Sequence, residues 1–224
     1  MKRTLLLIAL LAILSVAYSQ KEANYWYFGD YAGVNFGLGV PVALTDGQLS
    51  TGEGCSSISS SSGNLLFYTD GTTVWNKIHQ VMENGTNLHG HSSSTQSGLI
   101  VPNPSNSNIY YIFTVDARDN NLAYGLQYSV VDMSANGGLG RVDPLQKNIP
   151  LVAPACEKVT AVGNHVGNGF WVITHQWNTN AFYAYEILGS GVNTTPVISS
   201  VGATISGDME YSKGYIKVSP SGEK

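Results

Sequence analysis

The stretch Gly63–Asn76 reads GNLLFYTDGTTVWN and holds two short runs of apolar, aromatic and β-branched residues on either side of an Asp-Gly pair. Runs of this composition, bounded by Gly, Asn, Asp and Ser, are typical of β-strands. Asp70-Gly71 predicts a hairpin turn between the runs, because glycine tolerates the positive φ that tight turns require. We expect Phe67, Tyr68 and Trp75 to pack between neighbouring sheets rather than to carry out chemistry.

The same order of elements recurs along the chain: a strand, a turn rich in Gly, Asn or Ser, an aromatic strand, a loop and another strand. The first copy comprises Ser56–Ser59, Leu65–Thr69 and Thr73–Ile78. The second comprises Leu99–Val101, Ile109–Val115 and Leu126–Asp132, and the third Thr160–Val162, Phe170–Thr174 and Ala181–Ile187. A threonine closes or nearly closes the middle strand of each copy, at Thr69, Thr114 and Thr174.

A unit of three or four antiparallel strands that returns every ~40–60 residues is typical of a propeller blade. The repeat therefore predicts an all-β chain built as an incomplete β-propeller with WD40- or YVTN-like blades. It contains about three blades and the start of another. A β-sandwich is the alternative, because short strands at this spacing also suit that fold.

The repeat also predicts how the chain is divided. Residues 53–224 would be a partial propeller truncated at its C-terminus, since a fourth copy begins at Gly214 and stops in its first turn. Blades bury their faces against one another, so a closed ring needs about four or more. We expect the chain to be an N-terminal fragment, in which residues 20–52 supply strands that could close the ring.

Residues 1–19 have the three parts of a secretory signal peptide. Lys2 and Arg3 precede the apolar stretch Leu5–Val16, and Ala17–Ser19 places small residues before a predicted cleavage site between Ser19 and Gln20. The apolar stretch is shorter than the ~20 residues that a bilayer requires. We therefore expect a secreted or cell-surface protein, exported through the Sec pathway, whose mature chain has no transmembrane segment.

The charge of the mature chain argues against nucleic acid as a partner. The full chain has 11 basic and 15 acidic residues and a net charge of −4, and loss of Lys2 and Arg3 makes it −6. Proteins that bind nucleic acid need clustered Lys and Arg to replace counterions. Only Arg118 and Arg141 remain as arginines.

Several longer motifs resemble one known group of proteins. They are WYFGDYAGVNF at Trp26–Phe36, the segment Glu53–Asn76, SSTQSGLIVPNP at Ser93–Pro104, and IYYIFTVD at Ile109–Asp116. Together they resemble the N-terminal propeller region of Bacteroidota surface proteins that often carry PKD-like repeats. The resemblance implies a gliding-motility-associated protein with a type IX secretion sorting domain, which that machinery exports. It implies no catalytic residues.

Few residues are candidates for a metal site or a disulfide. His89 and His91 form an H-x-H pair that could share one metal ion if it lay on a strand, although no third ligand is evident. The loop Asp116–Asn121 offers oxygen ligands without the spacing of a calcium loop. In an exported chain Cys55 and Cys156 could form a disulfide, or both could be buried core residues.

These observations favour a non-catalytic surface module that serves in binding or scaffolding, with a link to adhesion, a surface glycan or protein as partner and no cofactor. No nucleophile elbow or phosphate loop is present in the sequence. The alternative is a propeller enzyme of lactonase or quinoprotein type, whose site would lie in the central channel of the completed ring. Fold alone cannot decide between them, since propellers host both kinds of function.

Overall fold

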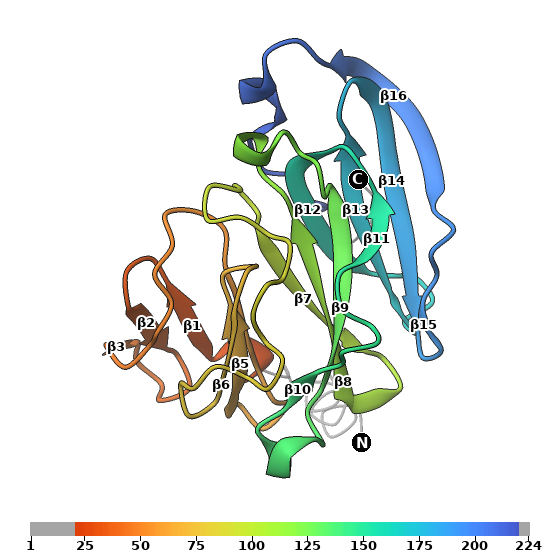
Figure 1. Ribbon diagram of the computed structural model, residues 1–224. Helices are drawn as coiled ribbons and strands as arrows, with labels where there is room; N and C mark the ends of the chain where they lie inside the picture. Colours follow the sequence, from red (N-terminus) through yellow and green to blue (C-terminus); the bar gives the residue numbers. More distant parts are fainter. Residues whose placement is uncertain (1–20, 220–224) are drawn as a thin grey trace, which may run out of the picture.

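The computed structural model of the chain describes residues 21–219, and within them it is an all-β protein of four antiparallel sheets (Figure 1). The predicted signal peptide, its cleavage site between Ser19 and Gln20, and the last five residues lie outside the described residues. The all-β class is therefore confirmed. The sheets follow one another in chain order, and consecutive strands pair within each of them, except that the last strand of each five-stranded sheet pairs with its third strand.

The first two sheets have three strands each. Sheet 1 consists of β1 (Tyr25–Phe28), β2 (Ala32–Asn35) and β3 (Val42–Leu44). Sheet 2 consists of β4 (Ser56–Ser59), β5 (Leu65–Thr69) and β6 (Val74–Asn76). The strands predicted at the N-terminus thus pair with one another and form a sheet of their own.

The last two sheets have five strands each. Sheet 3 consists of β7 (Gly98–Asn103), β8 (Asn106–Val115), β9 (Leu126–Asp132), β10 (Arg141–Val142) and β11 (Ile149–Val152). Sheet 4 consists of β12 (Ala155–Gly163), β13 (Phe170–Gln176), β14 (Thr179–Leu188), β15 (Gly191–Val192) and β16 (Val197–Ile205). Four single-turn 3₁₀ helices lie outside the sheets: η1 (Lys21–Ala23), η2 (Arg118–Asn120), η3 (Asn136–Gly138) and η4 (Met209–Ser212).

The turn predicted at Asp70-Gly71 joins β5 to β6. Gly71 has a φ of +87°, in the left-handed region that favours glycine. The Oδ1 atom of Asp70 accepts hydrogen bonds from the backbone N–H groups of Thr72 and Thr73 and from the Thr72 hydroxyl, at 2.8, 2.7 and 2.8 Å. One carboxylate therefore satisfies the donors of the turn, as Asp does in turns generally.

The aromatic residues of the same stretch pack between sheets, as predicted. Phe67 faces sheet 3, where its ring lies 5.5 Å from that of Tyr110 in an edge-to-face contact. Tyr68 faces sheet 1 and stacks on Tyr27 at 4.5 Å. Trp75 stacks on the same Tyr68 ring at 5.6 Å. Adjacent residues of one strand therefore join two different interfaces, because side chains alternate between the faces of a sheet.

A β-bulge in β5 changes this alternation at its start. Ile58 of β4 pairs with Phe67, and the next residue of β4, Ser59, pairs with Leu65, so Leu66 is the extra residue. As a result Leu66 packs with Phe67 toward sheet 3, whereas Leu65 packs with Tyr68 toward sheet 1.

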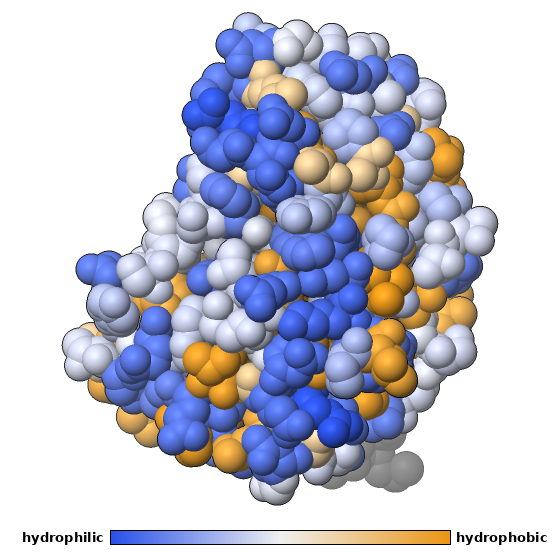
Figure 2. Space-filling model, viewed as in Figure 1, coloured by the Kyte–Doolittle hydropathy of each residue, from blue (hydrophilic) through white to orange (hydrophobic). Residues whose placement is uncertain are grey.

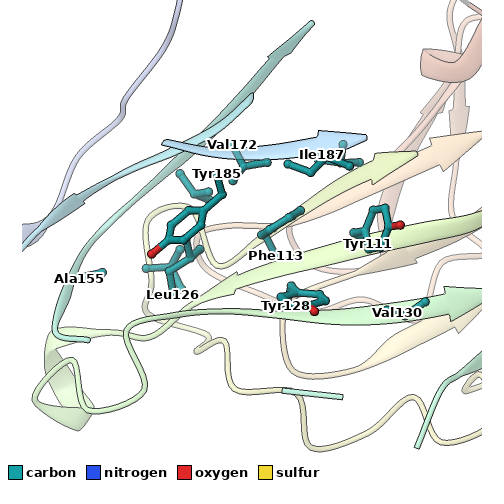
Figure 3. Close-up of a cluster of buried hydrophobic side chains, with 12 residues drawn as sticks. Tyr111, Phe113, Leu126, Tyr128, Val130, Ala155, Val172, Tyr185 and Ile187 are labelled. Atoms are coloured by element: carbon teal, nitrogen blue, oxygen red, sulfur yellow. The ribbon is translucent and has the colours of Figure 1, made fainter. Parts of the chain in front are cut away.

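The largest core lies between sheets 3 and 4. Figure 3 shows Val172, Tyr185 and Ile187 of sheet 4 above Phe113 and Tyr128 of sheet 3, and all five are buried. The three repeated threonines are fully buried as well. The hydroxyls of Thr69 and Thr174 donate to nearby carbonyl oxygens, whereas that of Thr114 has no hydrogen-bond partner.

The segment Ser94–Ser97 connects several sheets. The Ser94 carbonyl accepts a hydrogen bond from Gly54 N–H, and the Ser97 hydroxyl donates to the Asp70 carbonyl oxygen. The side-chain oxygen of Gln96 accepts from the N–H groups of Val159, in β12, and of Ile216, each at 3.1 Å. Segments far apart in the sequence are therefore held at one point.

Apolar side chains are exposed on the outer face of sheet 1. Trp26 and Phe28 lie on the same face of β1, because side chains alternate between the faces of a strand. The two residues are 51% and 39% exposed. Phe36 contacts Trp26 edge to face at 5.2 Å. The face of the molecule in Figure 2 is, by contrast, mostly hydrophilic, with hydrophobic side chains in small separate groups.

Candidate ligand-binding cleft

A cleft of about 640 Å³ lies between sheets 2 and 3. Two turns form its walls, one between β4 and β5 and the other between β7 and β8. Most of the polar lining residues carry a hydroxyl or an amide: Ser60, Ser61, Ser105, Ser107, Asn103, Asn106 and Asn108. The apolar lining residues are Ile58, Leu66, Pro102, Pro104, Tyr110 and Met133, and Glu22 and Gly138 complete the lining.

The first wall is the Ser-Ser-Gly-Asn turn between β4 and β5, whose position the sequence predicted. The Ser60 N–H donates to the Asn64 carbonyl and the Gly63 N–H to the Ser60 carbonyl, both at 2.8 Å. The hydroxyls of Ser60 and Ser62 bond to each other at 2.8 Å, and the Asn64 amide donates to Ser62 at 3.1 Å. The hydroxyl of Ser61 takes no part in this network.

The second wall is held by Asn103. Its Oδ1 atom accepts from the N–H groups of Ser105 and Asn106 at 2.8 and 3.0 Å. Its Nδ2 atom donates to the Tyr111 hydroxyl at 2.8 Å and to the Gly189 carbonyl at 3.2 Å. One buried amide therefore fixes the turn to the strand that follows it and to sheet 4.

Tyr110 lies at the floor of the cleft and is only 7% exposed. Burial raises the pKa of its hydroxyl, and the charge of the Glu22 carboxylate raises the pKa further. The phenol therefore stays protonated at neutral pH and offers a hydrogen-bond donor beside a carboxylate acceptor.

Part of the polar lining of the cleft is unpaired within residues 21–219. Ser61, Ser107 and Asn108 have side-chain polar groups without an intramolecular hydrogen bond among the described residues, and the hydroxyl of Tyr110 and the carboxylate of Glu22 have none either. Those five groups are free to bond to a ligand. Among the described residues Glu22 supplies the one carboxylate of the lining, whereas acid–base hydrolysis of a glycosidic bond uses two.

The structure places His89 and His91 in separate local contacts. The His89 ring stacks on Tyr124 at 3.9 Å, and its Nδ1 atom lies 2.9 Å from Oε1 of Gln127. The Nδ1 atom of His91 accepts from the Ser93 N–H at 3.1 Å. Within residues 21–219, no three His, Cys, Asp or Glu side chains are grouped as a metal site would need, so the pair has no third ligand.

Asp116 closes its own loop. Its carboxylate is 1% exposed and accepts from the N–H groups of Ala117 and Tyr124 and from the Asn120 amide, at 2.8, 2.9 and 2.9 Å. The loop Asp116–Asn121 thus directs its buried carboxylate oxygens inward to its own donors.

Glu157, which was not among the candidate residues expected from the sequence, is fully buried. One carboxylate oxygen accepts from the Arg118 N–H at 2.8 Å, and the other from the N–H and hydroxyl of Thr95 at 3.0 and 3.2 Å. A signal was present, because Glu157 lies between the buried residues Ala155 and Val159 at the period of two that marks one face of a strand. The residue ties sheet 4 to two loops of other sheets.

A second cluster joins sheets 1 and 2 at a shallow cavity of about 360 Å³. The Tyr27 hydroxyl donates to Asp46 at 3.0 Å, and the Nε2 atom of His79 lies 3.4 Å from the same carboxylate. The Nδ1 atom of His79 lies 3.1 Å from the Tyr68 hydroxyl. These groups satisfy one another, which makes the cluster a joint between the sheets.

Both cysteines are free thiols in the structure and lie in different hydrophobic clusters, Cys55 beside Tyr68 and Cys156 beside Trp177. The disulfide that the sequence allowed between Cys55 and Cys156 is therefore not formed in the structure. The Sγ atom of Cys156 lies 3.7 Å from Nδ1 of His175, a pairing that the sequence spacing did not indicate. Burial raises the pKa of this thiol to about 11, so it is a neutral, unreactive thiol and not an activated nucleophile.

Comparisons of the chain with models of protein families, with curated proteins and with solved structures found no match in any of the three. None of the helices in residues 21–219 is long and apolar enough to cross a membrane.

Proposed function

We propose that the chain is a non-catalytic binding module of an exported cell-surface protein, and that its four sheets are consecutive blades of a β-propeller. The observation that carries the binding function is the cleft between sheets 2 and 3, whose fixed walls present unpaired hydroxyl and amide groups. Export and surface location rest on the signal peptide and on the resemblance of the motifs.

Three features support the propeller arrangement. The sheets follow one another in chain order, and the first three strands of each form an antiparallel meander. Their first strands are neighbours, since β4 contacts β1 and β7, and β7 contacts β12. The outer face of sheet 1 exposes Trp26, Phe28 and Phe36, which a further blade would cover.

The walls of the cleft also support binding, because they are ordered before a ligand arrives. Asn103 and the serine network of the first wall hold the two turns through side-chain hydrogen bonds. A site fixed in this way loses little conformational entropy when it binds.

The proposal is tested by filling the cleft. Ser61 and Ser107 are exposed residues without hydrogen bonds of their hydroxyls, so Ser61→Trp and Ser107→Trp place a large ring at each wall without breaking a bond of the fold. Ser92→Trp, at an exposed serine in the loop that precedes β7, is the matched control.

The measurement is co-sedimentation of the purified chain, processed to begin at Gln20, with envelopes isolated from the producing cells. We expect both cleft variants to lose binding and the control to bind like the parent. Equal binding by all four proteins would overturn the cleft as the site. Surface location is tested separately by N-terminal sequencing of the exported protein, where a start other than Gln20 would contradict the predicted cleavage.

A further inference from the structure

We propose that the cleft between sheets 2 and 3 binds a neutral saccharide chain. The hydroxyl groups of the saccharide donate hydrogen bonds to Glu22 and accept hydrogen bonds from Tyr110, Ser107 and Asn108. This inference rests on the proposed function and adds the chemical class of the ligand. It follows from the charge of the lining, from the pairing of donors with acceptors and from the apolar surface between them.

The charge of the lining disfavours an anionic ligand. Among residues 21–219, Glu22 is the one charged residue that lines the cleft, and none of the lining residues is Lys, Arg or His. Lys77 extends toward Gly138 at the rim without lining the cleft. A phosphate or an acidic sugar would therefore meet a carboxylate in the lining and the Lys77 ammonium only at the rim, whereas recognition of such groups uses Arg or Lys.

A single carboxylate is also a poor basis for binding a cation. An ion pair with one solvent-exposed carboxylate contributes little to affinity. As an acceptor-only group with two oxygens, however, the Glu22 carboxylate can accept hydrogen bonds from several hydroxyl groups at once. A ligand with many hydroxyl groups and no charge uses this capacity fully.

The arrangement of polar and apolar groups suits a sugar ring. Tyr110 supplies a donor at the floor, and Ser61, Ser107 and Asn108 supply groups that can donate and accept at the walls. Ile58, Leu66 and other apolar residues lie between them and can contact the C–H faces of a ring. The volume of about 640 Å³ lies in the range of pockets that hold a small ligand, which is about 300–1,000 Å³.

The test uses neutral hexasaccharides as probes: cello-, xylo-, manno- and chitohexaose, with hexagalacturonate as the charged control. Binding to the processed chain is measured by calorimetry and by shifts of backbone amide resonances. Tyr110→Phe removes only the hydroxyl and keeps the ring contact with Phe67, and Glu22→Gln removes only the charge. Their matched controls are Ser92→Ala and Glu53→Gln, at exposed residues outside the cleft.

We expect at least one neutral hexasaccharide to bind, to shift the amides of Ser61 and Asn108, and to bind more tightly than hexagalacturonate. Each cleft variant should weaken binding about three- to tenfold, the effect of one hydrogen bond, and each control less than about twofold. The inference is overturned if no neutral probe binds at millimolar concentration, if the charged probe is preferred, or if the cleft variants bind like the controls.

The two proposals fail in different ways. If Ser61→Trp and Ser107→Trp abolish envelope binding but no neutral hexasaccharide binds, the cleft is the site and the ligand class is wrong. If the tryptophan variants bind envelopes like the parent, the proposed function itself fails.

Discussion

Replacement of Asp70 by alanine tests the turn that decides the fold. The Asp70 Oδ1 atom accepts two backbone N–H groups and one hydroxyl at 2.7–2.8 Å, and the residue is 9% exposed. Hydrogen bonds to a charged group contribute about 1.5–3 kcal/mol each. Thr72 and Thr73 are only half-buried, so water replaces part of what is lost. We therefore expect Asp70→Ala to lower the free energy of unfolding by about 2–4 kcal/mol.

Asp70→Asn is the matched control, because the asparagine side chain retains an oxygen acceptor in the same place and also favours turns. It should cost about 1 kcal/mol or less, the difference between a charged and a neutral acceptor. The measurement is urea unfolding of the processed chain, followed by circular dichroism and by tryptophan fluorescence, with coincident transitions required.

Two results would refute this reasoning. If Asp70→Ala unfolds within about 0.5 kcal/mol of the parent, the turn bonds do not contribute to stability as the geometry requires. If Asp70→Asn is as damaging as Asp70→Ala, the carboxylate charge is needed and the acceptor alone is not sufficient. Amide exchange of Thr72 and Thr73 provides a local check, since both protons should exchange faster in Asp70→Ala only.

The remaining predictions concern titration, the thiols and the exposed face of sheet 1. Burial, together with the charge of Lys158, lowers the pKa of His175 below its ordinary value of 6.5, so its neutral form is favoured in the fold. Just below pH 6.5 the unfolded chain then binds more protons than the folded chain. The contribution of neutral His175 to the free energy of unfolding is therefore present above that pH and is lost as the pH falls through the pKa of the folded state. The urea midpoint should therefore fall more between about pH 8 and about pH 5 in the parent than in His175→Asn, and equal falls would contradict this. Because burial raises the pKa of both thiols, Cys55 and Cys156 should resist alkylation at neutral pH in the folded chain. Both should be alkylated in denaturant without reductant, and a chain with no alkylated thiol under those conditions would contain a disulfide. Finally, the double variant Trp26→Ser, Phe28→Ser should reduce concentration-dependent self-association in sedimentation velocity. It should leave the free energy of unfolding within about 0.5 kcal/mol of the parent, because both residues are exposed. Unchanged association would mean that this face does not mediate self-association.

The repeated strands are the part of the fold that could be predicted from the sequence. All nine strands expected from the repeat are present, and Leu126–Asp132 and Leu65–Thr69 have the predicted bounds. β12 begins at Ala155, five residues before its predicted start, because a strand containing Glu157 and Lys158 looks like a polar loop until the buried partners of Glu157 are known. β16 was missed as well, since it pairs with β14 at the outside of sheet 4 and is almost entirely exposed.

The candidate site was less accessible to prediction. The sequence located both turns that form the cleft, through their Ser, Gly, Asn and Pro residues, but not that the two turns face each other. The histidines that attracted a metal hypothesis are instead held by Tyr124, Gln127 and Ser93, none of which a spacing rule would select. Asn103 looked like an ordinary turn residue, and its bond to the Gly189 carbonyl is visible only in three dimensions.

The sequence by itself determined the nine repeated strands, the turns between them and the all-β class, because alternation of apolar residues and the conformational preferences of Gly, Asn and Asp act over a few residues. Only the tertiary structure decided that Tyr25–Leu44 forms a separate sheet, that Gln96 joins β12 to the segment at Ile216, and that a cleft opens between sheets 2 and 3. Sheet 1 is separate because its strands pair with their own neighbours in the sequence, whereas the bonds of Gln96 and the cleft depend on contacts between residues tens to more than a hundred positions apart. Such contacts are set by how whole sheet faces pack, and local sequence preferences carry no record of them.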